Sequence, residues 1–263
     1  MTYENIDLSI RDGVAWITIN RPKAYNALDL PSMKEVFDIA NRIGGDPAVR
    51  VAVLTGAGDK AFCAGGDVAG FAADPDGVQL LLKEMTGYLH MAISRLAWMN
   101  APLIASVNGV AAGAGLSLVA CCDLAICADN ARFTSAYTQI GMTPDGSSTY
   151  FLPRIIGTRR TAELYLTNRT LSAQEALDWG LVNRVVPAAE LADQVQALAQ
   201  QLAQGPTRAY GGIKRLLQMA PNDSLESQME RETRSIVELS RSADGLEGVR
   251  AFVEKRRPSF SGS

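Results

Sequence analysis

The chain has 263 residues, of which 47% are hydrophobic and 20% are charged, so it can bury a full core and lacks the composition of a disordered protein. Its formal net charge of −3 argues against binding that depends on neutralising many phosphates, so nucleic acid is not an expected partner. The chain has a single histidine, and its four cysteines lack the paired two-residue spacing of a zinc site, so no metal is expected either.

The N-terminal residues lack the basic start and the apolar stretch of a secretory signal, so we expect a cytoplasmic protein with reduced thiols. The run between Arg95 and Asp123 carries no charge and is long enough to cross a membrane. Asparagine, proline and glycine residues interrupt it, and three short buried elements describe it better than one span. No membrane association is therefore predicted.

Short runs rich in β-branched residues predict strands at residues 14–19, 51–54, 103–107, 124–127 and 131–133. Apolar residues at helical spacing predict helices at residues 31–43, 80–96, 116–122 and 146–156. This alternation of strands and helices predicts an α/β core. Strand signals fade after residue 188, and helices are predicted at residues 191–202, 207–219, 224–240 and 246–256. We therefore expect a core over residues 1–202 and a helical C-terminal region over residues 203–263.

Two glycine clusters each follow a predicted strand, the first at residues 64–67 and the second at residues 113–115. Small residues let backbone N–H groups reach a ligand, and the helix expected after the second cluster would point its positive end at that ligand. Two such N–H groups aimed at one oxygen form an oxyanion hole, although glycines also serve tight turns and close packing. Residues 56–61 formally fit a dinucleotide fingerprint, but no helical period follows them, so no nicotinamide cofactor is predicted.

Several segments together carry a specific resemblance, namely residues 20–28 (NRPKAYNAL), 54–56 (LTG), 60–67 (KAFCAGGD), 108–115 (NGVAAGAG), 176–182 (ALDWGLV) and 251–258 (AFVEKRRP). With these segments the chain resembles the crotonase superfamily, also called the enoyl-CoA hydratase/isomerase family, over nearly its whole length. The resemblance implies a crotonase-like spiral of ββα units. It also implies that the helical C-terminal region serves trimer formation, often within a hexamer made of two trimers.

The same resemblance implies an acyl-CoA substrate, so coenzyme A is part of the substrate and no separate cofactor is expected. The thioester oxygen would be held by the backbone N–H groups of Gly66 and Ala114. The coenzyme A moiety would contact Lys23, Ala24, Ala64, Gly65 and Asp67. The acyl group would lie against residues 67–88 together with C-terminal residues.

Side chains must identify the reaction, because the family performs several reactions on one scaffold. The two glutamates of the family's hydratases fall on Ser117 and Tyr137 here, and neither residue can replace a carboxylate base. Asp145 matches an aspartate of members resembling the phenylacetate-pathway isomerase and of 4-chlorobenzoyl-CoA dehalogenases. By itself Asp145 is typical of a helix N-cap, but the resemblance favours a catalytic role.

Two further residues have both an ordinary and a functional interpretation. The spacing of His90 places it on the polar face of its helix, but the dehalogenases have a water-activating histidine at the matching place. Tyr137 stands where the dehalogenases have a catalytic tryptophan, so its hydroxyl either substitutes for the indole N–H donor or belongs to a core aromatic.

The leading hypothesis is an enoyl-CoA isomerase that moves a double bond from the 3,4 to the 2,3 position with Asp145 as its acid–base group. Residues 241–252 also resemble the phenylacetate-pathway isomerase, which suggests ring-derived or unsaturated acyl groups. The first alternative is hydrolytic dehalogenation, in which Asp145 attacks a ring carbon and His90 directs water onto the aryl ester. Enoyl-CoA hydration and non-catalytic binding of coenzyme A thioesters are further alternatives.

Overall fold

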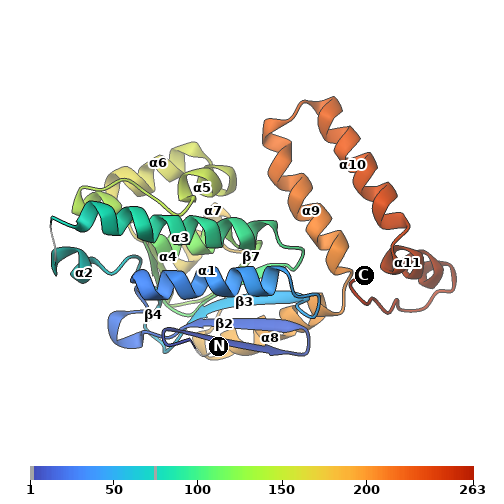
Figure 1. Ribbon diagram of the computed structural model, residues 1–263, viewed down its shortest axis with the longest axis horizontal. Helices are drawn as coiled ribbons and strands as arrows, with labels where there is room; N and C mark the ends of the chain where they lie inside the picture. Colours follow the sequence, from blue (N-terminus) through green and yellow to red (C-terminus); the bar gives the residue numbers. More distant parts are fainter. Residues whose placement is uncertain (1–2, 74–75) are drawn as a thin grey trace.

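The computed structural model describes residues 3–73 and 76–263, which form two β-sheets wrapped by helices (Figure 1). The larger sheet has the strand order β1-β2-β3-β5-β7-β10, and its strands are Ile6–Arg11, Val14–Ile19, Val51–Gly56, Leu103–Val107, Leu124–Ala128 and Arg184–Val186. The smaller sheet has the order β4-β6-β8-β9, with strands Ala61–Cys63, Val110–Ala112, Arg132–Thr134 and Leu171–Ser172. The predicted α/β class is confirmed.

Successive turns of the chain add one strand to each sheet. The pairs β3 and β4, β5 and β6, and β7 and β8 follow one another along the chain, and within each sheet these strands pair in parallel. Only short connections separate the two strands of a pair, so the chain advances as a spiral. The predicted strands at residues 14–19 and 103–107 have the predicted bounds, and the other three predicted strands shift by one or two residues.

Side chains alternate between the two faces of the larger sheet, and a different set of helices covers each face. Helices α1 (Leu30–Gly44), α3 (Val78–Trp98) and α4 (Ala114–Cys121) belong to one hydrophobic core with Ala52 and Leu54 of β3. Helix α8 (Leu191–Ala203) covers the other face and packs against Val51 and Val53. Every residue of α4 is buried, so this helix lies at the centre of the molecule.

The remaining elements before α8 surround the first core. Helices α2, α5, α6 and α7 span Val68–Ala73, Ser148–Ile156, Thr158–Thr167 and Ala173–Trp179. The 3-10 helices η1, η2 and η3 span Pro22–Ala24, Tyr137–Ile140 and Ala188–Glu190. Four of the predicted helices begin two or three residues away from their predicted starts. Helix α3 begins at Val78 instead of residue 80, and α11 (Ala243–Val253) begins at Ala243 instead of residue 246. Helix α4 begins two residues before the predicted residue 116, and α5 begins two residues after residue 146, because Gly146 and Ser147 have left-handed backbones with φ of +60° and 60°.

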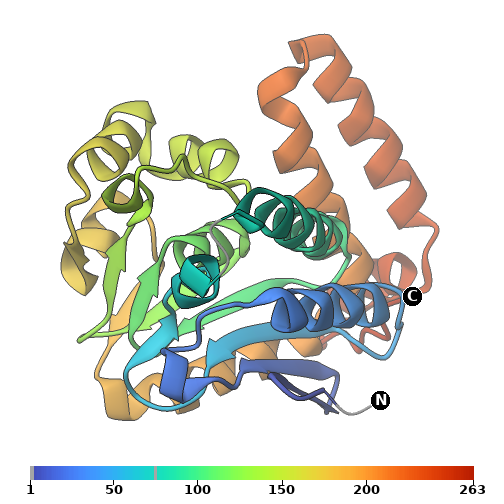
Figure 2. The same ribbon diagram turned by 60° about the vertical axis from the view of Figure 1, so that its left-hand side comes forward.

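The C-terminal helices extend away from the core, as Figures 1 and 2 show from two directions. They are α9, the 3-10 helix η4, α10 and α11, which span Thr207–Met219, Ala220–Asn222, Leu225–Ser240 and Ala243–Val253. Lys214 attaches α9 to the core, because its buried Nζ lies 2.8 Å from Asp123 Oδ2 and donates to the carbonyl of Ala101 at 3.0 Å. Many apolar side chains of this region are exposed, among them Leu225 at 71% and Phe252 at 85%. Trimer formation through residues 203–263 stays a prediction.

The uncharged run between Arg95 and Asp123 is divided among the end of α3, β5, β6 and α4. Each of these elements is far shorter within the run than a membrane span requires. Among the residues with described structure, no helix is long and apolar enough to cross a membrane.

Candidate active site

The two glycine clusters of the sequence lie against each other. Gly65 follows β4 with φ of +102°, and Gly113 precedes α4 with φ of +51°. A Cβ atom added to Gly65 would lie 3.0 Å from the carbonyl oxygen of Ala112 and 3.4 Å from the backbone nitrogen of Ala114. Both the backbone conformation and the close approach therefore require glycine at position 65.

This arrangement leaves two backbone N–H groups available. Leu28 donates to the carbonyl of Gly65 at 2.7 Å and accepts from the N–H of Asp67 at 2.9 Å, so the N–H of Gly66 faces the opposite side of the chain. Ala114 is the first residue of α4, where an N–H has no partner within the helix. Over residues 3–73 and 76–263, neither N–H group donates to a backbone carbonyl or a side chain. Both residues line the same cavity, as an oxyanion hole requires.

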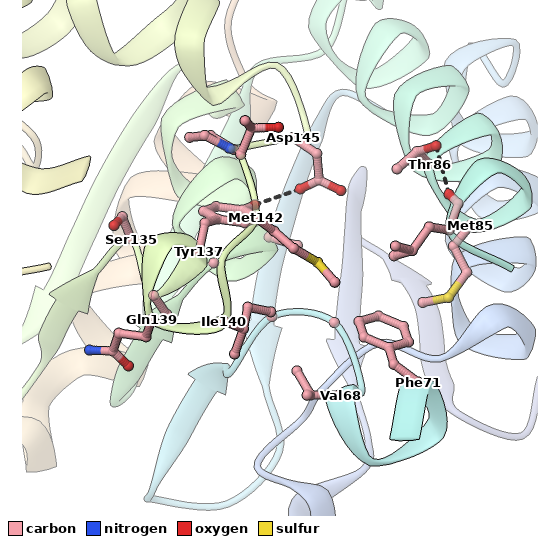
Figure 3. A pocket seen from close by; sticks show the side chains of 18 of the residues that line it. Val68, Phe71, Met85, Thr86, Ser135, Tyr137, Gln139, Ile140, Met142 and Asp145 are labelled. Carbon is pink, nitrogen blue, oxygen red and sulfur yellow. Dashed lines mark hydrogen bonds between the residues drawn. The ribbon is translucent and has the colours of Figure 1, made fainter. Parts of the chain in front are cut away.

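The cavity has a volume of about 650 Å³ and collects residues from α1, α2, α3, both glycine clusters and the segment from Ser135 to Asp145. Figure 3 shows Val68, Phe71, Met85, Ile140 and Met142 around its apolar part. Residues from the stretch 67–88, which is predicted to meet the acyl group, line this cavity, and residues 74 and 75 of that stretch lie outside the described residues. Contact of this stretch with an acyl group stays a prediction. Of the described chain, no residue after Asp145 lines the cavity, so C-terminal residues do not complete the pocket within one subunit.

Asp145 lies on the irregular segment between η2 and α5, with its carboxylate facing the cavity opposite Met85 and Thr86 (Figure 3). Its Oδ1 accepts a hydrogen bond from the Tyr137 hydroxyl at 2.5 Å. Its Oδ2 has no hydrogen-bond partner within the part of the chain that the structure describes. The N-cap of α5 is Ser147, and no side chain caps this helix, so the interpretation of Asp145 as an N-cap is wrong.

Tyr137 is held as a neutral hydrogen-bond donor. Burial raises the pKa of its phenol far above the usual value, and the neighbouring Asp145 carboxylate raises that pKa further. The hydroxyl also lies 3.3 Å from Ser117 Oγ, which donates to the backbone carbonyl of Asp145 at 3.0 Å. Tyr137 therefore lines the cavity and orients Asp145, which excludes its interpretation as a simple core aromatic.

Ser117 is fully buried beneath this segment and faces Gly146. A Cβ atom added to Gly146 would lie 2.7 Å from the Cβ of Ser117, so the backbone of Gly146 packs directly against the Ser117 side chain. No cavity-lining residue other than Asp145 carries a carboxylate in the described ranges. The described wall therefore provides one carboxylate, which is one fewer than a two-carboxylate reaction requires.

The His90 side chain contacts the same segment from a position outside the cavity wall. It lies on α3, and its Nε2 accepts a hydrogen bond from the backbone N–H of Gly146 at 3.1 Å. The acceptor nitrogen must be unprotonated, so this contact requires the neutral imidazole with its proton on Nδ1. His90 is not among the residues that line the cavity. The structure thus brings His90 next to the loop of Asp145 without giving its lone pair access to a substrate.

The residues predicted to hold coenzyme A fall into two groups. Ala64 and Gly65 line the cavity, whereas Lys23 and Ala24 lie on η1 outside it, with the Lys23 side chain exposed. Asp67 is also outside the cavity wall, and its carboxylate forms an ion pair with Arg21 at 3.1 Å. Arg21 pairs with Asp29 at 2.8 Å as well. This arginine therefore ties η1 to the first glycine cluster, two residues of which line the cavity with Ala64.

Some wall residues are absent from the sequence-based predictions, among them Met33, Ile140 and Met142. Isolated apolar side chains carry no pattern that distinguishes a cavity wall from a hydrophobic core. Arg21 lies within the quoted segment 20–28, but its ion pair with Asp67 joins it to a residue 46 positions away in the chain. Only the folded arrangement identifies these residues.

Comparisons with known proteins agree with this geometry. The family model described as enoyl-CoA hydratase/isomerase matches residues 9–263. The chain is 39% identical over 234 residues to 4-chlorobenzoyl coenzyme A dehalogenase-2 of Arthrobacter sp, covering 89% of this chain and 84% of that protein. It is 37% identical to the 1,2-epoxyphenylacetyl-CoA isomerase of Escherichia coli, covering 96% and 97%. The crystal structure of an enoyl-CoA hydratase from Bacillus anthracis superposes with a TM-score of 0.93 at 32% identity, covering 99% of this chain and 100% of that one.

Proposed function

The chain belongs to the enoyl-CoA hydratase/isomerase family, and we propose that it converts a 3-enoyl-CoA into a 2-enoyl-CoA with Asp145 as the single acid–base group. One observation carries this proposal. Asp145 is the only carboxylate in the described wall of the cavity, and one of its two oxygens has no hydrogen-bond partner among the described residues. A double-bond shift needs a single group that removes a proton and then returns it to a different carbon.

In the proposed reaction the thioester carbonyl oxygen accepts hydrogen bonds from the N–H groups of Gly66 and Ala114. Negative charge that develops on this oxygen is stabilised there, and each donor of an oxyanion hole typically contributes about 10²–10³ in rate. Asp145 Oδ2 removes a proton from the α-carbon, which leaves a dienolate. The protonated carboxyl then returns the proton to the γ-carbon, the carbonyl re-forms and the double bond lies between the α- and β-carbons. No atom is gained or lost.

Tyr137 supports this cycle by holding Oδ1. A donor that remains neutral can stay bonded to the carboxylate while the other oxygen removes a proton. The hydrogen bond also fixes the orientation of the carboxyl group toward the cavity, and a fixed near-attack geometry is a large part of a catalytic rate. Coenzyme A itself is proposed to enter between η1 and the first glycine cluster, near Lys23, Ala24 and Asp67.

The other reactions fit the site less well. Hydration by two carboxylates would need acidic groups at positions 117 and 137, where Ser117 and Tyr137 stand. Dehalogenation has one specific observation in its favour, the 39% identity to a 4-chlorobenzoyl coenzyme A dehalogenase, and Asp145 could serve as its nucleophile. It also needs a base for water, and the lone pair of His90 Nε2 is engaged by Gly146 outside the cavity.

A small panel of acyl-CoAs tests the proposal, namely a 3-enoyl, a 2-enoyl and a 4-chlorobenzoyl thioester, each followed by chromatography of the products. We expect the 3-enoyl thioester to become the 2-enoyl thioester without added cofactor. Hydration of the 2-enoyl thioester, or chloride release from the third compound, at a rate above the isomerisation would contradict it. Absence of turnover with all three would favour a non-catalytic binding protein.

We also propose that the chain acts as a cytoplasmic homotrimer or hexamer. The exposed apolar side chains on α10 and α11, among them Leu225, Ile236, Leu246 and Phe252, support self-association because a monomer rarely exposes such surfaces. Analytical ultracentrifugation tests the assembly directly.

A further inference from the structure

The acyl part of the cavity is largely apolar and lacks cationic side chains in its described wall. Phe71 and Met85 form one side of it, and Ile140 and Met142 form the other (Figure 3). Among the described residues that line the cavity, none is a lysine, an arginine or a histidine. The single charged side chain is the Asp145 carboxylate, which is negative when it is ready to remove a proton.

A second negative charge on the substrate would therefore have no cationic partner among the described residues of this cavity. A carboxylate moved from water into an apolar site pays for its lost hydration unless a cation or several donors replace the water. Here the two free backbone donors, Gly66 and Ala114, are needed by the thioester oxygen, and Asp145 would repel the added charge. The other polar side chains of the described wall, among them Thr86, Gln139 and Thr143, are neutral, so no cation there compensates an added carboxylate.

The shape of the wall is less selective than its charge. Methionine side chains are flexible and adapt to differently shaped partners, and the face of a phenylalanine ring accepts either a flat ring or a chain of methylene groups. Met33 and Met85 are buried at 2% exposure, whereas Val68 and Ile140 are 46% and 44% exposed, so only the inner part of the wall is shielded from water before a ligand enters. An aromatic and an aliphatic acyl group are expected to be accommodated similarly.

We propose that the cavity selects neutral hydrocarbon acyl groups and rejects acyl groups that end in a carboxylate. This inference rests on the proposed function only in placing the acyl chain of a coenzyme A thioester in this cavity. It does not depend on which reaction follows.

The direct test compares the binding of hexanoyl-CoA and adipoyl-CoA to the unmodified protein by isothermal titration calorimetry. The two ligands have six-carbon acyl chains and differ by the terminal carboxylate, and neither has a double bond to isomerise. We expect adipoyl-CoA to bind at least about tenfold more weakly. Equal affinity, tighter binding of adipoyl-CoA, or no binding of either ligand would overturn the inference.

A matched pair of variants locates the effect. Val68 lines the cavity with 46% of its surface exposed, so Val68→Lys can place a cation at the wall with its stem along apolar neighbours. We expect this change to reduce the preference for hexanoyl-CoA by a factor of about three or more. Leu80→Lys adds the same charge on α3 at a position that is 75% exposed and outside the cavity, and should leave the preference unchanged.

An equal change of the preference in both variants would show that the overall charge of the protein, and not the cavity wall, causes the discrimination. Failure of the two proposals is distinguishable. A protein that discriminates between the saturated ligands but does not turn over a 3-enoyl-CoA retains the selectivity and loses the proposed reaction. A protein that isomerises a 3-enoyl-CoA yet binds both saturated ligands equally retains the proposed reaction and loses the proposed selectivity.

Discussion

Replacing Tyr137 by phenylalanine should slow the proposed isomerisation by about 10- to 100-fold. The substitution removes one hydroxyl from a hydrogen bond of 2.5 Å to Asp145 Oδ1 and keeps the ring that lines the cavity. A hydrogen bond to a charged group contributes about 1.5–3 kcal/mol, and each 1.4 kcal/mol corresponds to a factor of ten. The expected loss therefore follows from the hydrogen bond if it holds the carboxylate in its reactive orientation.

The assay is the conversion of a 3-enoyl-CoA measured with Tyr137→Phe, Asp145→Asn and the double variant. Asp145→Asn removes the proposed base and should lower kcat by about 10²–10⁴. Because Tyr137 is proposed to act through Asp145, the double variant should be no slower than Asp145→Asn alone. A fully additive loss would refute the reasoning, as would unchanged activity of Asp145→Asn.

The pH dependence tests whether the Tyr137 hydroxyl stays protonated while the reaction proceeds. The raised pKa of Tyr137 keeps its phenol protonated well above pH 10, since a group with a raised pKa loses its proton only at higher pH than in the unfolded chain. The ratio of the unmodified rate to the Tyr137→Phe rate should therefore stay constant between about pH 6 and pH 9. A ratio that falls steadily over this range would mean that the hydroxyl ionises and does not serve as a permanent donor.

Three further changes test other parts of the site and the fold. Gly66→Pro deletes one proposed oxyanion donor and should lower turnover by about 10²-fold or more, whereas Gly66→Ala keeps the N–H and should cost far less. His90→Gln retains an acceptor for the N–H of Gly146 and should leave isomerisation nearly unchanged. Mass spectrometry of this variant after exposure to 4-chlorobenzoyl-CoA checks for an aryl ester on Asp145. Such an ester would contradict the proposed isomerase reaction. Lys214→Met leaves Asp123 without its partner and should lower the free energy of unfolding by about 3 kcal/mol in urea titrations, which an unchanged midpoint would disprove.

The strands and the glycine clusters could be predicted because their signals are local. Runs such as 14–19 and 103–107 are β-branched and buried, and a glycine cluster directly after a buried strand indicates close approach of the backbone. The start of α4 was harder to locate. Gly113 adopts φ of +51° and turns the chain directly into the helix, and periodicity does not register such a turn.

The contacts of His90 and Tyr137 could not be predicted, because the first joins segments distant in sequence and the second depends on an irregular stretch of backbone. His90 bonds to a backbone N–H that is 56 residues further along the chain, so its place on the polar face of α3 does not indicate that partner. The partner of Tyr137 depends on the irregular path of the segment between η2 and α5. That path includes left-handed backbones at Gly141, Gly146 and Ser147, which no periodic pattern specifies.

The site thus combines a rigid part with a part supported by side chains. The proposed oxyanion donors belong to backbone fixed by buried strands and by α4, so they depend little on the identity of nearby side chains. The proposed acid–base group instead lies on a loop outside both sheets, where hydrogen bonds of Tyr137, Ser117 and His90 hold the segment around Asp145. A change of a few loop residues can therefore alter the reaction while the stabilisation of a thioester oxygen is retained. This division explains physically why proteins similar to this chain carry names from different reactions, and why the side chains around Asp145, rather than the fold, must identify the reaction here.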